Sequence, residues 1–505
     1  MKYYLSIDAG TSVIKTVIFS QDFKMKFKSS IENKVQTNSK GKSEINMNSF
    51  WSLTSKLVKN SLKKSKIKNI NIIGVGITGN MVGVWPVNTK GKSVRNAILW
   101  NDARSKEIFD KIQINNPNIY QNIFDLTGSI VQFGCTIPVI KWLEKNEPQT
   151  IKKTDYFLTC KDWIRLNLTN EFNNDHTERA VAPGDIKKAD FSLKIFKLLK
   201  LNKKYLNKFP QVKKSQDIAG YITDKAAKET GLLSGTPVIV GLGDVPASAV
   251  GVGAIHNNQT STIIGTTCHN YLVSPKPIFI PKNSGLLFYS PNNQWLRTMI
   301  NVAGTTNLDW IVKNFFKEQL KYKTKFQILN EFEKNINQDN YLDNDIIYLP
   351  YLNYGGTISP FFNLNAKAEI FGLLPHHTGK DILLAAYQGI AFSIKDCYDS
   401  LNTKVKKLLL SGGGSTSKIL PQIIADTLNT NVSIPSGEEF GAKGVAYLCS
   451  VALGKEKNLK SIVKKSEKNN KIISPNKEMK TYYGSKFKKY LHLRKSLEPL
   501  WLTNY

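Results

Sequence analysis

The turn at residues 8–12 combines a carboxylate with small residues that leave their backbone N–H groups accessible. It reads Asp8-Ala-Gly-Thr11-Ser12 and follows an apolar run. Such a turn suits phosphate binding, because backbone N–H groups bind phosphate oxygens while the carboxylate reaches a Mg²⁺ that neutralises them. Lys15 is close enough in sequence to add a positive charge. An ordinary hairpin with a capping aspartate has the same appearance, so this turn alone leaves both interpretations open.

A second turn of similar composition lies near the middle of the chain. Gly265-Thr266-Thr267 offers the same small-residue backbone and hydroxyl groups, but it has no carboxylate. One turn with an acid and one without would let two halves of the protein hold a polyphosphate asymmetrically.

Two glycine-rich turns follow predicted strands elsewhere in the chain. In Gly241-Leu-Gly-Asp244, the aspartate is placed either to accept a proton from a substrate hydroxyl or to cap the helix that begins near Pro246. The three glycines of Gly412-Gly413-Gly414-Ser415 permit close approach to a flat ligand such as a nucleoside, or they form a flexible connection. Both alternatives remain open for each turn.

The elements that must position these turns alternate between strands and helices. Residues 3–8 and 14–19 form one predicted hairpin around the first turn, and residues 261–267 and 271–273 form another around the second. The two hairpins lie about 255 residues apart, which suggests two related halves. Further strands are predicted at 71–77, 84–87, 238–241, 407–411 and around 432, and helices at 50–63, 138–145, 224–230, 308–316, 381–401 and 420–428. This alternation predicts an α/β fold.

Composition limits the classes of protein that fit. The 505 residues are 41% hydrophobic and 22% charged, which is typical of a globular chain of two or three domains. No window resembles a membrane span, and Asp8 interrupts the first apolar run too early for a secretory signal, so we expect a cytoplasmic protein. The five cysteines and six histidines show no disulfide or metal-binding spacing.

The net charge of +31 invites a nucleic-acid-binding hypothesis, but only six of the 70 basic residues are arginine. Proteins that bind the phosphates and bases of nucleic acids favour arginine, so a solvated basic surface is the simpler interpretation. A dehydrogenase hypothesis rests on Gly74-Val-Gly76-Ile-Thr-Gly79 alone, and the required helix does not follow it. No P-loop is present. We therefore expect no nucleic-acid partner and no nicotinamide cofactor.

Taken in order, the motifs resemble those of the FGGY carbohydrate kinases, within the superfamily of sugar kinases, actin and heat-shock ATPases. The resemblance covers residues 3–455. Its most specific part is the second family signature, which Ala368-Glu-Ile-Phe-Gly-Leu373 followed by the segment from Asp381 to Gln388 satisfies. The other matching segments are Ile7–Ser12, Gly79–Met81, Leu99–Arg104, 158–177 with its Lys161-Asp162-Trp163, and 348–360.

The chain departs from the family pattern at three positions. Val139 follows Pro138 where the first signature usually has lysine, and Ser417 stands where an asparagine often lies near the adenosine. Val82 replaces the histidine that is typical of xylulokinases, which bears on the identity of the substrate.

The resemblance implies an α/β fold of two RNase H-like lobes, as in the actin-like ATPases, with a central cleft. The expected boundaries are 1–245 for a lobe that binds sugar and holds the first phosphate turn, 246–455 for a nucleotide-binding lobe, and 456–505 for a basic C-terminal extension.

It also implies ATP and Mg²⁺ as cofactors and a role for each site residue. Asp244 is the expected catalytic base, and Asp8 the expected Mg²⁺ ligand through water. The residues expected to bind the nucleotide and its phosphates are Asp8, Thr11, Ser12, Lys15, Gly265, Thr266, Thr267, Gly413, Gly414 and Ser417. Those expected to meet the sugar are Asn80, Met81, Trp100, Asn101, Asp102 and Asp244.

The expected reaction is ATP-dependent phosphorylation of a sugar hydroxyl, with a pentulose such as xylulose as substrate. Asp102 within Trp-Asn-Asp favours the pentulose, whereas the opening Gly-Thr-Ser-Val-Ile-Lys is similar to erythritol kinases and favours a polyol. The partners expected are the sugar or polyol and ATP, with a homodimer as the assembly considered and no membrane association.

Overall fold

The first sheet is built around the N-terminal hairpin. The computed structural model describes residues 1–39, 41–336 and 341–502. Strands β1 (Tyr3–Ala9), β2 (Val13–Ser20) and β3 (Met25–Glu32) pair antiparallel, and β6 (Ile72–Gly79) lies parallel to β1 on its other side. The order β12-β13-β6-β1-β2-β3 is completed by β12 (Ile218–Tyr221) and β13 (Pro237–Ile239), with β14 (Leu242–Gly243) also paired to β6.

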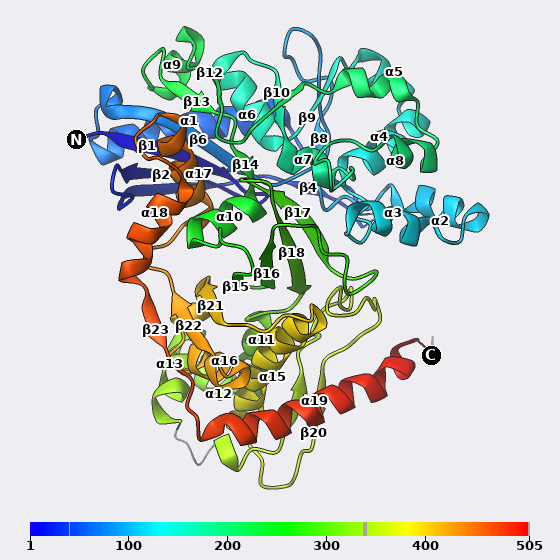
Figure 1. The fold of residues 1–505 in the computed structure, drawn as a ribbon, viewed down its shortest axis with the longest axis vertical. Helices are drawn as coiled ribbons and strands as arrows, with labels where there is room; N and C mark the ends of the chain where they lie inside the picture. The colour runs from blue at the N-terminus through cyan, green and yellow to red at the C-terminus, as the bar shows by residue number, and fades with distance from the viewer. Residues whose placement is uncertain (40, 337–340, 503–505) are drawn as a thin grey trace.

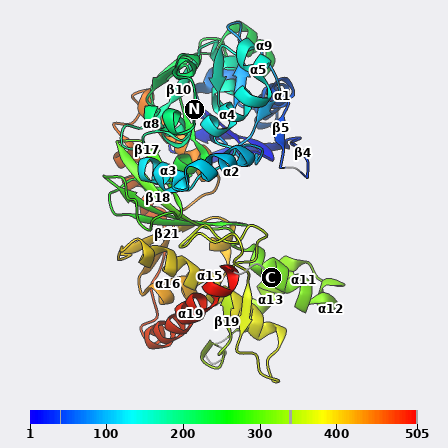
Figure 2. The same ribbon diagram turned by 90° about the vertical axis from the view of Figure 1, so that its right-hand side faces the viewer.

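The second sheet repeats this pattern. Strands β15 (Thr260–Ile264), β16 (Cys268–Ser274) and β18 (Gln294–Asn301) pair antiparallel, and β21 (Lys407–Ser411) lies parallel to β15. Strands β22 (Asn431–Ile434), β23 (Lys471–Ile473) and β17 (Leu286–Ser290) complete the order β17-β18-β16-β15-β21-β22-β23. The two halves form two lobes, one above the other in Figures 1 and 2, which confirms the predicted two-lobed α/β fold.

Helices surround both sheets, and short strands form smaller ribbons. The helices of the first half are α1 (Met47–Ser65), α2 (Lys106–Asn115), α3 (Ile119–Thr127), α4 (Thr136–Asn146), α5 (Pro148–Lys153), α6 (Cys160–Thr169), α7 (His176–Val181), α8 (Leu193–Leu198), α9 (Asp224–Thr230) and α10 (Asp244–Val252). Those of the second are α11 (Thr306–Phe315), α12 (Lys317–Leu320), α13 (Lys325–Asn335), α15 (Gly379–Ser400), α16 (Leu420–Leu428), α17 (Phe440–Ala452), α18 (Leu459–Ser466) and α19 (Met479–Leu502). The short strands are β4 (Gln36–Thr37), β5 (Ser43–Ile45), β7 (Trp85–Val87), β8 (Ala97–Ile98), β9 (Tyr156–Leu158), β10 (Asn173–Asp175), β11 (Gln211–Lys213), β19 (Ile347–Leu349) and β20 (Glu369–Phe371).

Local signals explain where the long helices begin. The Asn46 side chain accepts a hydrogen bond of 2.8 Å from the Ser49 N–H and caps α1. Thr378 and Asp381 form a capping box at the start of α15, whose buried face is apolar over most of its length. These two helices pack one in each lobe, α1 against the first sheet and α15 in the core of the second.

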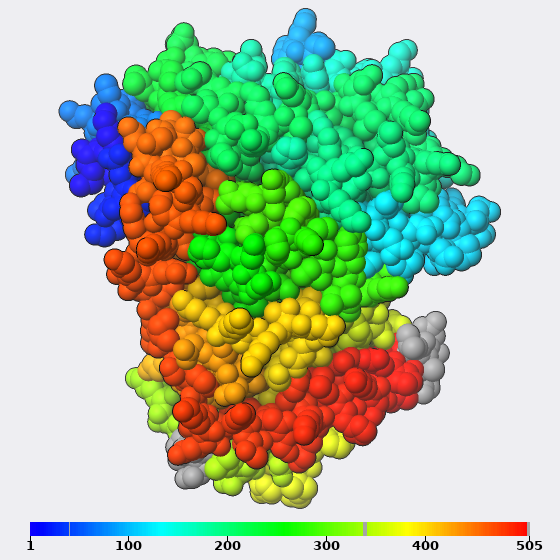
Figure 3. Space-filling model, viewed as in Figure 1, coloured from blue at the N-terminus to red at the C-terminus, as the bar shows by residue number. Residues whose placement is uncertain are grey.

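The lysine-rich C-terminal segment contacts both lobes: α18 packs in a core cluster with Tyr4 and Val17 of the first sheet, and the rest lies on the second lobe. Strand β23 extends the second sheet, and α19 buries Tyr483, Phe487 and Tyr490 in the core of that lobe. Figure 3 shows α19, in red, lying across the lower lobe. Residues 503–505 of the segment lie outside the described residues. Most lysines of α19 are exposed, whereas Lys486 is buried and donates to Gln388 Oε1 at 2.6 Å. A basic composition is therefore compatible with a well-packed helix.

Helices α10 and α17 cross where the two lobes meet, and glycines make the crossing possible. A Cβ on Gly444 would lie 2.1 Å from the Ala247 carbonyl oxygen, and one on Gly251 would lie 1.8 Å from that of Phe440. The glycines of the Gly74–Gly79 motif serve the same packing, since a Cβ on Gly76 would lie 3.0 Å from the Val445 carbonyl oxygen. That motif therefore lies within strand β6 and lets α17 pack closely against the sheet.

Among the described residues, no helix is both long enough and apolar enough to cross a membrane.

We predict that Gly444→Ala destabilises the fold by about 2–3 kcal/mol, because backbone atoms of Ala247 and Gly251 on α10 block its Cβ. The matched control is Gly484→Ala in α19, where a Cβ meets nothing within 4 Å and the substitution should stabilise the helix by about 0.5–1 kcal/mol. Denaturant unfolding of both variants checks this. Equal stability of the Gly444→Ala variant and the wild type would contradict the close crossing.

Candidate active site

Three of the predicted site residues meet where parallel strands end. Asp8 on β1 is level with Thr78 on β6, and Gly243 on β14 is level with Gly79. The carboxyl ends of parallel strands share one edge of the sheet. Asn80 and Asp244 are the next residues along the chain, so they lie at this edge beside Asp8. Asn80 donates both its backbone N–H (3.0 Å) and its side-chain Nδ2 (2.9 Å) to the Ala9 carbonyl oxygen.

The two carboxylates at this edge are electrostatically strained. Burial, together with the negative charges of Asp8 and Glu178, raises the pKa of Asp244 to about 7. Burial also raises the pKa of Asp8 to about 6, although Lys15 opposes the shift. Among the described residues, no side chain donates a hydrogen bond to either carboxylate; Asp244 accepts one from the Val245 N–H at 2.9 Å. Their oxygens are thus available to a proton, a cation or a ligand.

This donor set fits a magnesium ion bound through water. The described residues contain no group of three or more His, Cys, Asp or Glu side chains that could enclose a metal. Mg²⁺ does not need such a cage, because it keeps several water ligands and uses one or two carboxylates together with substrate phosphates. The carboxylate of Asp8 meets that requirement, because it is partly exposed and accepts no hydrogen bond from a described side chain.

The first phosphate turn is shaped by its neighbours. Asn33 holds it from one side, donating its Nδ2 to the Thr11 carbonyl oxygen (2.9 Å) and its backbone N–H to that of Ser12 (2.8 Å). The exposed Trp100 reaches it from the other side and donates its indole N–H to Thr11 Oγ1 (2.9 Å). The turn expected to hold phosphate and the loop expected to meet the sugar are therefore in direct contact.

Lys15 lies beside this turn with its charge already paired. Its Nζ is 2.8 Å from Glu439 Oε2, and Lys28 also pairs with Glu439. Its ammonium therefore links β2 to the start of α17.

The second turn lies beside the glycine-rich loop expected at the nucleoside. Ile263 pairs with Ser411 across β15 and β21, so residues 265–267 and 412–414 leave the sheet side by side. Gly412, at φ +85, approaches so closely that a Cβ would lie 2.4 Å from the Ile264 carbonyl oxygen. The loop before α11 supports the turn, with the Gly304 N–H donating to the Thr266 carbonyl oxygen at 2.7 Å. Thr266 is left exposed, Gly265 and Thr267 are half-buried, Gly413 is exposed and Gly414 is buried.

Ser417 is engaged at the start of the next helix. Its hydroxyl donates to Glu333 Oε1 at 2.6 Å and accepts from the Leu420 N–H at 3.0 Å. The side chain thus fixes the loop to α13 and α16.

The structure places the Asp102 carboxylate inside its own loop. Its side chain is fully buried, and its two oxygens accept hydrogen bonds from the Ser43 N–H (2.7 Å), the Arg104 N–H (3.0 Å) and two nitrogens of the Arg104 side chain (2.9 and 2.7 Å). A carboxylate has about four acceptor sites, so none is left for a sugar hydroxyl. Asp102 shapes the loop, while Trp100 and Asn101 on that loop are exposed.

Several residues at the site were not predicted. Cys160 is buried beside Asn80 and Ala9, and His269 lies 3.1 Å from the Thr267 hydroxyl. The sequence assigns no role to these two residues or to Lys161, Thr177 and Glu178. The available signal was a run of charged residues inside an otherwise apolar pattern, which marks buried ion pairs.

Comparison with known proteins identifies the class. The family model for the N-terminal domain of the FGGY family of carbohydrate kinases matches residues 3–251, and the model for its C-terminal domain matches residues 260–453. The chain belongs to the FGGY family of carbohydrate kinases, as the sequence motifs predict. It is a sugar kinase, and the sugar kinases of this family use ATP.

Individual relatives cover nearly the whole chain at low identity. The chain is 25% identical to a probable L-xylulose kinase of Haemophilus influenzae over 99% of its own length and 100% of the relative. It is 25% identical to the erythritol kinase of Brucella abortus over 89% and 87% of the two chains. The crystal structure of a ligand-bound xylulose kinase from Lactobacillus acidophilus superposes with a TM-score of 0.87 over 98% of each chain, at 21% identity, which shows the shared fold.

The buried Asp102 gives a prediction that separates a structural role from sugar contact. Asp102→Asn turns an amide N–H₂ toward backbone and guanidinium donors, so the free energy of unfolding should fall by about 3 kcal/mol. The control is Asp110→Asn in the exposed Lys106–Asp110 pair, which should change stability little. Denaturant unfolding with parallel kinetics checks this: unchanged stability together with a raised sugar KM would restore Asp102 as a sugar contact.

Proposed function

We propose that this chain transfers the γ-phosphoryl group of ATP to a hydroxyl of a pentulose such as xylulose, with Asp244 as the catalytic base. The observation that carries the proposal is the placement of Asp244 beside Asp8 and Asn80 at one sheet edge. Its raised pKa suits a base that works near neutral pH, because proton transfer is most effective when the pKa of the base is close to the pH.

Each lobe contributes one part of the reaction. Asp244 orients the attacking hydroxyl and takes its proton, while Asn80, Met81, Trp100 and Asn101 bind the sugar. Backbone N–H groups and hydroxyls of Thr11, Ser12 and residues 265–267 hold the phosphates, and Gly413 and Gly414 border the nucleoside. Mg²⁺ bound through water at Asp8 would supply the positive charge that the phosphates need. Phosphoryl transfer passes through a loose transition state, so positioning and charge neutralisation provide most of the rate.

The substrate class rests on relatives and on the loop that carries Trp100. A relative named as a probable xylulose kinase covers the full chain, and the structure of a named xylulose kinase shares its fold. A tetritol such as erythritol is the second candidate, because a named erythritol kinase is also 25% identical, over 89% of the chain. Asp102 no longer favours either, since it is internal to the loop.

We further propose a cytoplasmic location and a homodimeric assembly. All five cysteines are free and buried, which suits a reducing compartment, and ATP is a cytoplasmic substrate. Light scattering on the purified chain measures the oligomeric state directly.

ADP release in the presence of MgATP, across pentuloses, tetritols, hexuloses, gluconate and glycerol, tests the reaction. We expect one pentulose to give the strongest stimulation, and Asp244→Asn to lower kcat for it by about 10²- to 10⁴-fold with ATP affinity retained. Asp110→Asn serves as the surface control. Comparable turnover in the Asp244→Asn variant would overturn the base assignment, and selective stimulation by a tetritol would favour the polyol kinase.

The raised pKa of Asp244 predicts the pH dependence. A base must be deprotonated to act, so kcat/KM for the sugar should be high above the pKa and decline as the pH falls below about 7. The profile is measured at saturating MgATP, with ATP binding followed at each pH to exclude loss of nucleotide. A flat profile across the mildly acidic range would contradict a base of this pKa.

A further inference from the structure

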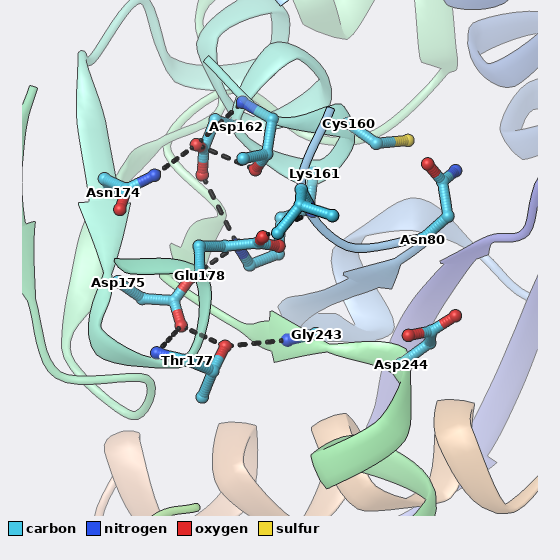
Figure 4. A network of polar contacts seen from close by, with 12 residues as sticks. Asn80, Cys160, Lys161, Asp162, Asn174, Asp175, Thr177, Glu178, Gly243 and Asp244 are labelled. Carbon is cyan, nitrogen blue, oxygen red and sulfur yellow. Dashed lines mark hydrogen bonds and ion pairs between the residues drawn. The ribbon is translucent and has the colours of Figure 1, made fainter. Parts of the chain in front are cut away.

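A cluster of charged side chains lies behind Asp244, away from the expected ligands. Helix α6 supplies Lys161, Asp162 and Arg165, and the start of α7 supplies Asp175 and Glu178. All five residues are 0–2% exposed. Lys161 is at the centre: its Nζ contacts Asp175 and lies 2.9 Å from Glu178 Oε1 and 3.6 Å from Asp162 (Figure 4). Arg165 pairs with Asp162 at 2.6 Å on the far side.

Two hydrogen bonds connect this cluster to the active-site backbone. Glu178 Oε2 accepts the N–H of Val82 at 2.7 Å, and Thr177 Oγ1 accepts the N–H of Gly243 at 3.1 Å. The Thr177 hydroxyl donates in turn to Asp175, which also accepts the Thr177 N–H at 2.8 Å. Gly243 immediately precedes Asp244, and Val82 follows Asn80 and Met81. Helix α7 is therefore bonded to both segments that carry the proposed base and sugar contacts.

The backbone conformation at Val82 must be stabilised by contacts from outside its own segment. Val82 has φ +55, a left-handed conformation that is costly for a β-branched residue, by about 1–3 kcal/mol. Such a conformation persists only where surrounding contacts determine it. The Val82 N–H donates its hydrogen bond to the buried Glu178 carboxylate.

The two held segments also touch each other. A Cβ on Gly243 would lie 2.3 Å from the Met81 sulfur, so the Met81 side chain rests directly on Gly243. Figure 4 shows Gly243 between Thr177 and Asp244, with Asn80 facing Asp244 from the neighbouring segment. A shift of α7 would thus move Gly243 and the residue 80–82 segment relative to each other.

We propose that Thr177 and Glu178, oriented by Asp175 and Lys161, are positioning residues that fix Asp244 relative to the sugar-binding segment at residues 80–82. The inference rests on the proposed function of Asp244. Stability alone gives little reason for such a cluster, because buried ion pairs are often replaced by apolar residues without loss. Directed acceptors for two particular N–H groups are what an apolar replacement could not provide.

Thr177→Val with its matched variant Thr177→Ser tests the inference. Valine has nearly the same shape but cannot accept the Gly243 N–H, whereas serine keeps the hydroxyl. We expect Thr177→Val to lower kcat by about 10- to 100-fold per folded enzyme, because small misplacements of a catalytic group are costly. KM for ATP should be unchanged, and Thr177→Ser should restore most of kcat. Thr54→Val, which removes a buried hydroxyl bonded only within α1, controls for general loss of packing.

Hydrogen exchange provides a readout that does not depend on activity. The Gly243 peptide should exchange faster in Thr177→Val than in Thr177→Ser. If the valine variant does not fold, Glu178→Gln is used instead; it keeps an acceptor for Val82 but breaks the pair with Lys161, and it should lower kcat with KM for ATP retained.

Wild-type kcat in a folded Thr177→Val or Glu178→Gln variant would overturn the inference, as would equal loss in the serine and valine variants. Failure of the proposed function is recognised separately, by an Asp244→Asn variant that keeps full turnover. In that case the exchange of Gly243 still decides whether Thr177 holds the segment.

Discussion

The candidate site depends on the parallel pairing of β1, β6 and β14. Because parallel strands end at one edge, two carboxylates and an amide from three distant parts of the chain come together there. The same pairing forces Asp8 and Asp244 into mutual repulsion in a half-buried position, with no side-chain donors to offset it. The pKa values of about 7 for Asp244 and about 6 for Asp8 match what a phosphotransferase needs: one group that takes a proton near neutral pH and one that attracts a cation.

The repeated sheet explains how the two lobes divide this work. In both sheets a run of antiparallel strands, β3-β2-β1 in the first and β17-β18-β16-β15 in the second, is followed by a parallel strand. Both therefore present a turn at the same place in the fold. Only the first turn carries a carboxylate; the second relies on backbone and hydroxyl groups, with the loop at Gly304 and the loop at Gly412 packed against it. Helices α10 and α17 join the lobes through contacts that only glycines allow, and Asp244 is the first residue of α10. The base is thereby part of the connection between the lobes.

Local patterns were sufficient to predict much of this arrangement. The hairpins around residues 8–12 and 265–267 follow from apolar runs interrupted by small residues, and α15 follows from its capping box and apolar face. Contacts between residues far apart in the sequence could not be predicted. Lys15 is paired with Glu439, and Ser417 with Glu333, and no local sequence pattern indicates either partner. For Asp102 the difficulty is local. The sequence shows a carboxylate next to an exposed tryptophan and an exposed asparagine, and it does not show that backbone and arginine donors of the same region occupy both carboxylate oxygens.

The cluster behind Asp244 shows why a polar core is useful at this place. Apolar packing is non-directional, so it would hold α7 near the sheet without specifying which backbone groups it faces. The strained conformation of Val82 and the close contact of Met81 with Gly243 require more than proximity. A carboxylate and a hydroxyl, each fixed by Lys161 or Asp175, specify one position for two N–H groups. Burying these charges costs free energy, but the charges pair among themselves. The directed hydrogen bonds that they provide fix the backbone next to Asp244, on which the proposed chemistry depends.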